Sequence, residues 1–423
     1  MVQTVCGKVR PEELGHFQIH EHIWVHHTPL ADKNPALRID DYEKSLAELK
    51  TYRNAGGCGF ADAQPVAAGR NAEMLKKLSE ESGVHMKAIQ YAAARNWSLV
   101  EVPTPEPGPH QVLIRVKACG ICKTDLSLHV GSFLAKFPLI NGHEFAGVVE
   151  KVGSAVKDFK PGDRVTADNT ELCGHCDACR ADKPLYCENF DSHGCNMDGG
   201  FAEYVLINHD KVFPIHNLTF EQATFAEPTA CAVHGVDRIA PKFGDTIVMF
   251  GAGPTGIILA QLLRRAGAGR MIICDPNAHK LEILKKYGFE ETIVMDRNDP
   301  SKHTAILKEL MPKGFDICID ATGAPSVFAA LFDFAHKGSK IVAYGCCPAD
   351  ATVPVNPYDI FAEEYTILGS FAQTHCFDRA LYYLESGIVQ VQELISHELP
   401  LEGYGDGLQL ILDKKAHKVI IKP

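Results

Sequence analysis

The sequence predicts an α/β fold that combines a β-rich region with a doubly wound parallel sheet, and two patterns carry this prediction. Short runs rich in β-branched residues and separated by Pro and Gly follow Met86, among them KAIQYA, SLVEVP, QVLIRVKA and AGVVEKVG, and they are typical of an antiparallel region. Beyond about residue 232, apolar strands such as TIVMFGAG, RMIICD, DICIDATG and KIVAYG alternate with helical segments. That alternation is the pattern of a parallel sheet covered by helices.

The first eighty-five residues differ from both regions. A short strand in FQIHEHIWVHH carries His20 and His22, which lie on one face of a strand and so can bind a single metal ion. A helix is expected in IDDYEKSLAELKTYRNAGG, with Asp40 or Asp41 as its N-cap and Gly56 and Gly57 as its stop. A strand in CGFADAQPV and a second helix in NAEMLKKLSEESG complete this segment.

These patterns divide the chain into three regions. With 423 residues it exceeds one ordinary hydrophobic core. We expect an N-terminal fragment of residues 1–85, a β-rich domain made of 86–231 together with 372–423, and a parallel-sheet domain of 232–371.

The overall composition excludes several classes of function. A net charge of −11 argues against nucleic-acid binding as the main activity. The chain has no run of eighteen apolar residues that predicts a membrane-spanning helix, and its opening MVQTVCGKVRPEELG lacks the apolar core of a secretion signal. The 15 cysteines are clustered, which favours metal ligands and reduced thiols in a cytoplasmic protein.

A dinucleotide site is predicted by TIVMFGAGPTG, which places Gly251, Gly253 and Gly256 between an apolar strand and a helix. In a G-x-G-x-x-G turn the glycines allow a tight bend, a close approach of the pyrophosphate and close helix–strand packing. The next strand ends in Asp275, an acidic residue placed to accept from ribose hydroxyls and to repel a 2′-phosphate, which favours NAD over NADP. Lys280 could contact the ribose or be an exposed helix lysine.

A structural zinc site is predicted by ELCGHCDACRADKPLYC, with C-x2-C-x2-C-x7-C spacing. Four thiolates close a tetrahedral site with no open position. An iron–sulfur cluster also uses x2 spacings, but the long last gap and the lack of a Pro after the last cysteine count against it. The expected ligands are Cys173, Cys176, Cys179 and Cys187.

A second, dispersed set of ligands predicts a catalytic metal site. KACGICKTD contributes Cys122, NGHEFAG contributes His143 and Glu144, and TFAEPTACAVHG contributes Glu227. A thiolate, an imidazole and one or two carboxylates with a position left open describe a catalytic zinc rather than a closed site. Spacing alone leaves open a buried thiol at Cys122 and a polar turn at His143 and Glu144.

The motif G-H-E-x2-G-x5-G-x2-V at residues 142–156 resembles the zinc signature of the medium-chain alcohol dehydrogenases. The resemblance extends from about Met86 to the C-terminus and includes CGICKTD, the four-cysteine segment, GGFAEYV, the EPT segment and the Gly-rich turn, in the order of that family. It implies a GroES-like β-rich catalytic domain and a Rossmann domain that binds NAD.

The resemblance also implies roles for individual residues. Cys122 and His143 match the catalytic zinc ligands, and Glu144 matches a carboxylate that binds zinc in some members only. Glu227 stands where other members have a second cysteine, and its Glu-Pro is similar to the sorbitol, arabitol and threonine dehydrogenase branches. Asp125 matches a carboxylate that supports the zinc ligands.

The proton route departs from the family pattern. Thr124 matches the hydroxyl that takes the substrate proton, but Ser127 stands where many members have a histidine that passes it to solvent. His129 lies two residues further and would face the same side only if the segment were extended.

The implied function is a zinc-dependent oxidoreductase that transfers a hydride between NAD and a polyol or other secondary alcohol. Threonine or a simple alcohol is the alternative substrate. The non-enzymatic alternative is a redox-silent protein that binds NADH or has a structural role. The complete set of zinc ligands argues against it. The family implies a homodimer or homotetramer acting on a small molecule, with no nucleic acid or membrane partner.

The N-terminal fragment resembles the phosphotriesterase-like metal-dependent hydrolases. His20 and His22 match ligands at the end of the first strand of their TIM barrel, and Gly69 and Arg70 also match. About two of eight β/α units cannot close a barrel, and the remaining ligands have no counterpart, so we expect no metal there even if Asp62 or His85 adds a ligand. Hydrolysis at this site is the rival enzymatic activity.

Overall fold

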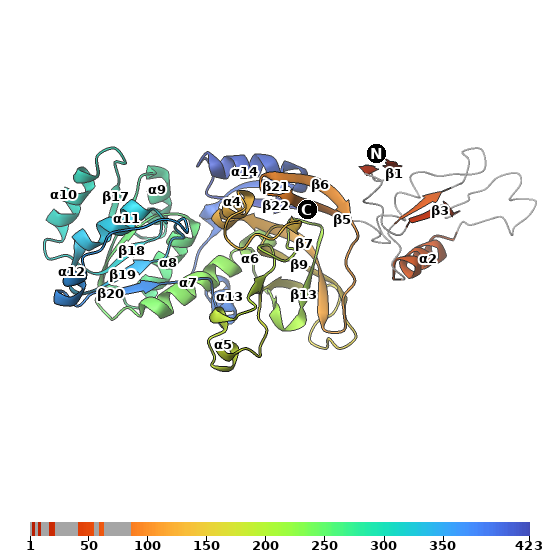
Figure 1. The fold of residues 1–423 in the computed structure, drawn as a ribbon, viewed down its shortest axis with the longest axis horizontal. Coiled ribbons are helices and arrows are strands. Elements are labelled where there is room, and N and C mark those ends of the chain that lie inside the picture. The colour runs from red at the N-terminus through yellow and green to blue at the C-terminus, as the bar shows by residue number, and fades with distance from the viewer. Residues whose placement is uncertain (1, 5–6, 10–16, 22–40, 55–58, 63–85) are drawn as a thin grey trace, which may run out of the picture.

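The computed structural model describes residues 2–4, 7–9, 17–21, 41–54, 59–62 and 86–423. Their elements form an N-terminal fragment, a β-rich part and a part built on a parallel sheet, and these follow one another along the long axis of the molecule (Figure 1).

The N-terminal fragment contains a β-α-β arrangement. The strands β3 (Phe17–Glu21) and β4 (Gly59–Asp62) pair in parallel, with helix α2 (Tyr42–Asn54) between them in the chain. A separate hairpin joins β1 (Val2–Thr4) to β2 (Gly7–Val9). The expected strand, helix and strand are therefore confirmed. Asp41 precedes α2 and accepts a hydrogen bond from the Lys44 amide at 3.2 Å, as an N-cap does.

Several predictions for this fragment fall on residues that the structure leaves undescribed. His22, Gly69, Arg70 and His85 lie outside the described residues, as does the expected helix in NAEMLKKLSEESG. The backbone of His20 belongs to β3. The metal site expected to be empty there therefore stays a prediction.

The β-rich part is organised around a seven-stranded sheet in the order β14-β10-β9-β7-β22-β21, with β13 also paired to β7. The last two strands come from the C-terminal end of the chain, so the sheet joins segments far apart in the sequence. Its strands are β7 (Gln111–Ile121), β9 (Glu144–Val152), β10 (Arg164–Ala167), β13 (Tyr204–Asn208), β14 (Val212–Pro214), β21 (Ile395–Pro400) and β22 (Lys418–Lys422).

A three-stranded sheet lies beside it, in the order β6-β5-β8. These strands are β5 (Met86–Ala93), β6 (Asn96–Val102) and β8 (Leu139–Ile140). Ile89 and Tyr91 of β5 are fully buried in the core of the β-rich part. Helices α4 (Lys123–His129), α5 (Asp177–Arg180), α6 (Phe220–Ala223) and α14 (Tyr404–Leu412) and the pair β11 (Thr170–Glu171) and β12 (Asp191–Ser192) complete this part.

The parallel sheet has six strands in the order β17-β16-β15-β18-β19-β20, which is the 3-2-1-4-5-6 order of a Rossmann fold. The predicted doubly wound sheet is therefore confirmed. Its strands are β15 (Thr246–Phe250), β16 (Arg270–Asp275), β17 (Thr292–Val294), β18 (Phe315–Asp320), β19 (Ala335–Ala343) and β20 (Thr366–Gly369). Its helices are α8 (Pro254–Arg265), α9 (Ala278–Lys286), α10 (Pro300–Leu310), α11 (Pro325–Ala330) and α12 (Pro357–Ala362).

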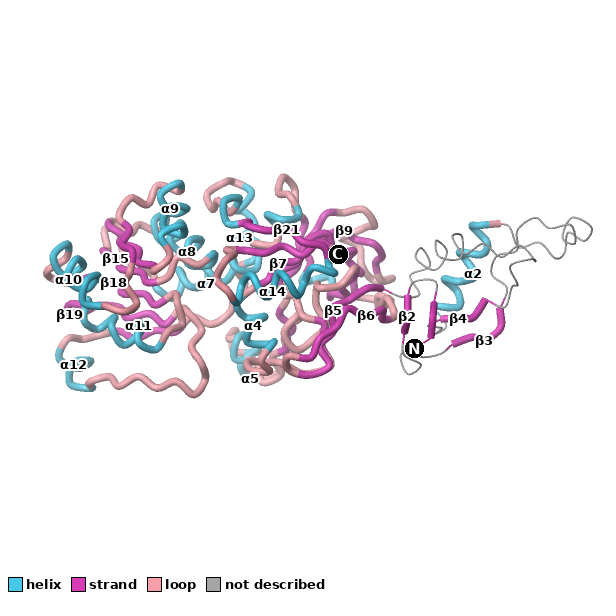
Figure 2. Tube along the Cα trace, turned by 90° about the horizontal axis from the view of Figure 1, so that it is seen from above, coloured by secondary structure: helices cyan, strands magenta, loops and turns pink. Residues whose placement is uncertain are grey.

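Helix α7 (Ala226–Ile239) connects the two parts, and Figure 2 shows it between the two sets of strands. It packs against α8 and against α13 (Phe377–Glu385), and its buried side belongs to the same apolar core as β15 and β18. Its first turn approaches β9 of the β-rich sheet. Glu227, in that turn, is thereby carried to the boundary between the two parts. In the described part of the chain, no helix is long and apolar enough to cross a membrane.

We predict that a chain beginning at Met86 folds with a melting temperature within a few degrees of the full-length protein. All three strands β5, β6 and β8 remain in such a chain, whereas a chain beginning at Asn96 loses the central strand with Ile89 and Tyr91. Thermal unfolding of both truncations checks this. An unfolded Met86 chain would show that residues 1–85 are part of the core.

Candidate active site and metal centres

Three of the predicted metal ligands converge at one end of the β-rich sheet. Ligand atoms of Cys122, His143 and Glu144 all lie within 4.8 Å of one another. His143 and Glu144 are buried, and Cys122 is partly exposed. One thiolate, one imidazole and one carboxylate at this separation fit a zinc ion with a coordination position left open.

The pairing of β7 with β9 brings these residues together. Gly120 of β7 lies directly opposite Glu144 of β9, and Cys122 follows two residues later at the start of α4. A Cβ atom at Gly120 would come within 2.3 Å of Glu144 Oε2. Only glycine at this position leaves room for the carboxylate, so the register and the glycine together form the site.

Asp125 supports this group from the first turn of α4. One of its carboxylate oxygens accepts a hydrogen bond from the Cys122 amide at 2.8 Å, and the other lies 3.6 Å from His143 Nδ1. The side chain is fully buried. The carboxylate therefore fixes the backbone at Cys122 by a hydrogen bond and lies beside the imidazole of His143 without a hydrogen bond to it.

Thr124 lies at the metal group, with its Oγ1 3.7 Å from Cys122 Sγ. Ser127 is three residues further along α4 and therefore shares its face, whereas His129 does not. Instead, His129 Nδ1 is 2.9 Å from the hydroxyl of Tyr91. The extended geometry that would align His129 with Ser127 does not occur.

A buried ion pair ties Glu144 to the C-terminal strand. Lys418 Nζ donates to Glu144 Oε2, and both side chains are almost fully buried. Burial opposes the charge on Lys418, but the carboxylate of Glu144 and the thiol of Cys122 outweigh it and raise its pKa above the ordinary value. Glu144 Oε1 is buried without a hydrogen-bond partner and remains available to a metal ion. No sequence motif marks Lys418.

Glu227 lies close to this group but outside the set of ligand atoms within 4.8 Å. Burial raises the pKa of its carboxyl group, and the nearby charges of His143 and Glu144 act on it in opposite directions. Its Oε1 accepts a hydrogen bond from Cys231 Sγ at 3.2 Å. Tyr344 directly follows β19, and its buried hydroxyl has no hydrogen-bond partner among the described residues. Burial raises the pKa of this hydroxyl, and the nearby side chains of Cys231 and Glu227 raise it further.

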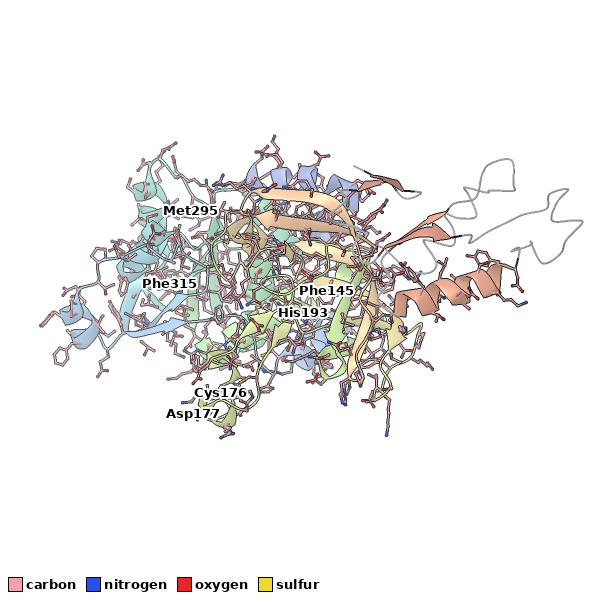
Figure 3. The ribbon with its side chains drawn as sticks, turned by 45° about the vertical axis from the view of Figure 1, so that its right-hand side comes forward. Phe145, Cys176, Asp177, His193, Met295 and Phe315 are labelled. Carbon is pink, nitrogen blue, oxygen red and sulfur yellow. The ribbon has the colours of Figure 1, made fainter. Side chains whose placement is uncertain are left out.

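The four cysteines of the second predicted site also converge. The sulfur atoms of Cys173, Cys176, Cys179 and Cys187 lie within 4.8 Å of one another. The spacing suits a tetrahedral ion bound about 2.3 Å from each sulfur. Amides of His175 and Cys176 stabilise the thiolate of Cys173 and lower its pKa to about 6. Figure 3 shows Cys176 at the tip of a lobe, far from Phe145 in the β-rich core.

The Gly-rich turn has the geometry that a pyrophosphate requires. Gly251 has a φ of +112°, and a Cβ atom there would come within 2.9 Å of the Ala321 backbone. A Cβ atom at Gly256 would meet the carbonyl oxygen of Gly251 at 2.5 Å, whereas one at Gly253 would meet no atom within 4 Å. The free space at Gly253 borders the N-terminus of α8, where unpaired amides attract an anion.

Asp275 is at the end of β16, as predicted, and both its oxygens bind backbone amides. Oδ2 accepts from Ala252 and Oδ1 from Asn277, each at 2.8 Å. Lys280 is in the first turn of α9, and its positive charge lies near the imidazole of His417 in the C-terminal segment. Burial, followed by Lys280 and His279, lowers the pKa of His417 to about 4. Sequence motifs do not identify His417.

A search among known proteins decides the family. The chain is 42% identical to D-arabinitol dehydrogenase 1 of Uromyces fabae over 80% of its own length and 97% of that relative. The chain belongs to the zinc-binding alcohol dehydrogenases. Residues 108–217 match the Alcohol dehydrogenase GroES-like domain, and residues 254–386 match the Zinc-binding dehydrogenase family.

Two further relatives support the same family. A D-altritol 5-dehydrogenase of Agrobacterium fabrum is 33% identical over 75% of this chain and 93% of that relative. A zinc-binding dehydrogenase of Sinorhizobium meliloti, solved with NADP bound, is 34% identical with a TM-score of 0.75, covering 80% of this chain and 99% of that one. The alcohol or polyol dehydrogenase class, with zinc and a nicotinamide cofactor, is thus confirmed.

The N-terminal resemblance is confirmed as well. Residues 1–94 match the Phosphotriesterase family. This match extends through β5, a strand that the structure places between β6 and β8 of the β-rich part.

We predict that Lys418→Met lowers the free energy of unfolding by about 3–5 kcal/mol, because it leaves the buried carboxylate of Glu144 without its cation. Lys422→Met on the same strand is the matched control. Lys422 is 43% exposed and pairs with Glu221 and Glu398, so its loss should cost about 0–1 kcal/mol. Chemical denaturation measures both, and equal effects would contradict a structural role for the Lys418 pair.

Proposed function

We propose that the chain oxidises a secondary hydroxyl group of a polyol to a ketone with NAD as hydride acceptor. The observation that carries this proposal is the convergence of Cys122, His143 and Glu144 beside Thr124, at the end of β7. The Gly-rich turn of the neighbouring Rossmann sheet supplies the cofactor site. Lys123 joins the two parts, since its Nζ donates to the Thr322 carbonyl at 2.9 Å.

Each side chain then has a defined task. Zinc, when bound, supplies a Lewis acid that polarises the hydroxyl oxygen, and NAD supplies the hydride acceptor. Cys122 and His143 would hold the metal, and Asp125 caps the backbone at Cys122 and lies beside His143. Glu144 or Glu227 would complete the ligand set. Thr124 Oγ1 would take the substrate hydroxyl proton as it passes its own proton to water, and Ser127 shares its face of α4.

We infer that NAD is preferred over NADP. A 2′-phosphate would have to approach the carboxylate of Asp275, which is held in place by two amides and so cannot turn away. A hollow of about 500 Å³ lies beside it, lined by Pro276, Asn277 and Val294 among others, and offers room for the adenine. Because the Sinorhizobium meliloti relative was solved with NADP bound, kcat/KM with NAD has to be compared with kcat/KM with NADP.

A five- or six-carbon polyol is the substrate that the relatives support best. The D-arabinitol and D-altritol enzymes are 42% and 33% identical to this chain. A threonine dehydrogenase of Stenotrophomonas maltophilia, at 32%, keeps L-threonine as the second candidate.

We predict that purified protein reduces NAD with D-arabinitol, D-altritol or sorbitol, and contains about two zinc ions per chain. Cys122→Ala should lower kcat/KM by at least about 10²–10³-fold, the scale on which electrostatic stabilisation is lost. Its zinc content should fall to one, because the four-cysteine site is untouched. Absorbance at the NADH band and metal analysis provide both measurements.

The same screen separates the alternatives. Turnover with L-threonine alone would replace the polyol assignment, and higher kcat/KM with NADP than with NAD would overturn the cofactor preference. Activity in a Cys122→Ala protein that holds one zinc would remove the proposed catalytic site. Ester or lactone hydrolysis without NAD would assign chemistry to residues 1–85.

We further propose a homodimer formed through β20. This strand is at the edge of the parallel sheet, and Ile367 on it is 43% exposed. Phe361 and Tyr358 of the preceding helix are 80% and 70% exposed. An exposed apolar edge pairs readily with a second copy about a twofold axis. Sedimentation should give twice the mass of one chain and a monomer for Ile367→Lys; a wild-type monomer would contradict the interface.

Three further inferences concern the domain boundaries, the cellular location and the N-terminal fragment. The proposed domain division at residues 85, 231 and 371 separates the strands of the two sheets, although residue 231 lies within α7 and α13 packs into the parallel-sheet core. A cytoplasmic location fits the described cysteines, none of which forms a disulfide. The N-terminal fragment, whose described residues form a β-α-β arrangement and a hairpin, is inferred to have no hydrolytic site of its own, because a barrel needs eight β/α units.

A further inference from the structure

Cys231 is a thiol at the catalytic centre to which the proposed reaction gives no role. It belongs to α7, is partly buried, and lies close enough to Cys122 and His143 to interact electrostatically with both. In the described part of the chain, its sulfur donates a hydrogen bond to Glu227 Oε1 at 3.2 Å.

The helix explains why these two side chains meet. Glu227 and Cys231 are four residues apart on α7, so they lie on one face. Side chains on a helix lean toward its N-terminus, which carries the Cys231 sulfur back over the turn that bears Glu227. A thiol is a weak hydrogen-bond donor, and an ionised carboxylate is a strong acceptor.

We propose that Cys231 is a positioning residue of the catalytic zinc centre. Its S–H donates to Oε1 of Glu227 and fixes the carboxylate, so that Oε2 is the oxygen left to turn toward Cys122 and His143. This inference rests on the proposed zinc site. The thiol acts through Glu227 and does not itself bind the metal.

The geometry of the two carboxylates explains why such support is needed. Lys418 fixes Glu144 through their ion pair. Glu227 lies outside the group formed by Cys122, His143 and Glu144, and Lys418 is not free to fix it as well. Without the thiol, rotation about the side-chain bonds of Glu227 would compete with metal binding. Removing a group that orients a metal ligand weakens metal binding by about 10–100-fold, and a weak donor places the effect near the lower end.

The test compares Cys231→Ala with Cys231→Ser, which keeps a hydrogen-bond donor of similar size. Cys231→Ala should release the catalytic zinc to a chelator at about 10-fold lower chelator concentration, and Cys231→Ser should stay within about 2-fold of wild type. In cobalt-substituted protein, Cys231→Ala should shift the ligand-field bands, while the thiolate-to-cobalt charge-transfer intensity stays unchanged in both variants.

Cys318→Ala is the matched control, because Cys318 is a fully buried thiol in β18 of the Rossmann sheet. It should alter the melting temperature but not zinc release or the cobalt spectrum. Comparable zinc loss in Cys318→Ala would reduce the Cys231 effect to general destabilisation and overturn the proposal.

Other outcomes overturn it in different ways. Unchanged zinc release in Cys231→Ala removes the positioning role, and equal loss in Cys231→Ser and Cys231→Ala makes the hydrogen bond irrelevant. Loss of charge-transfer intensity in both variants makes Cys231 a ligand instead. A wild-type protein with only one zinc refutes the proposed catalytic site itself, which separates that failure from a failure of this inference.

Discussion

The active site depends on the antiparallel register of β7 with β9 and β22. Gly120 opposite Glu144 and Ile121 opposite Val419 set which side chains surround the end of β7. A shift of one residue in either pairing would turn Glu144 or Lys418 to the opposite face of the sheet. Glu144 lies on β9 itself, and Cys122 and His143 directly adjoin the ends of β7 and β9, so the paired strands fix where all three ligands lie.

The site at the end of β7 contains more carboxylates than cationic side chains. Asp125 and Glu144 are buried carboxylates, Glu227 is partly buried, and Lys418 is the one buried lysine beside them in the described part of the chain. Burying unbalanced carboxylates is costly unless cations or hydrogen bonds compensate. A divalent ion at Cys122 and His143 supplies the missing charge, so metal binding and the stability of this region are linked.

Local patterns in the sequence predicted most of the fold. The strands of both sheets follow from β-branched runs and turn residues, and the Gly-rich turn and the four-cysteine lobe follow from spacing. Cys122, His143 and Glu144 were also predicted, through the resemblance. Lys418 and His417 could not be, because an isolated lysine or histidine carries no signal and each meets its partners only after β22 joins β7. Cys231 was missed because its importance depends on which face of α7 points at the metal. The position of His129 depended on whether residues 123–129 were helical, which the sequence left open.

The position of β5 has a consequence for how the chain tolerates its N-terminal addition. Met86 begins a strand that pairs with β6 from its first residue and with β8 at Gln90 and Tyr91, so this strand is already part of the catalytic part where the addition ends. The match to the hydrolase family continues to residue 94, so the same strand satisfies two unrelated sequence patterns. A short extended segment with buried apolar residues is generic enough to serve either architecture. Such a strand is a natural splice point, at which one fold can be replaced by another without leaving an unpaired edge in the enzyme that follows.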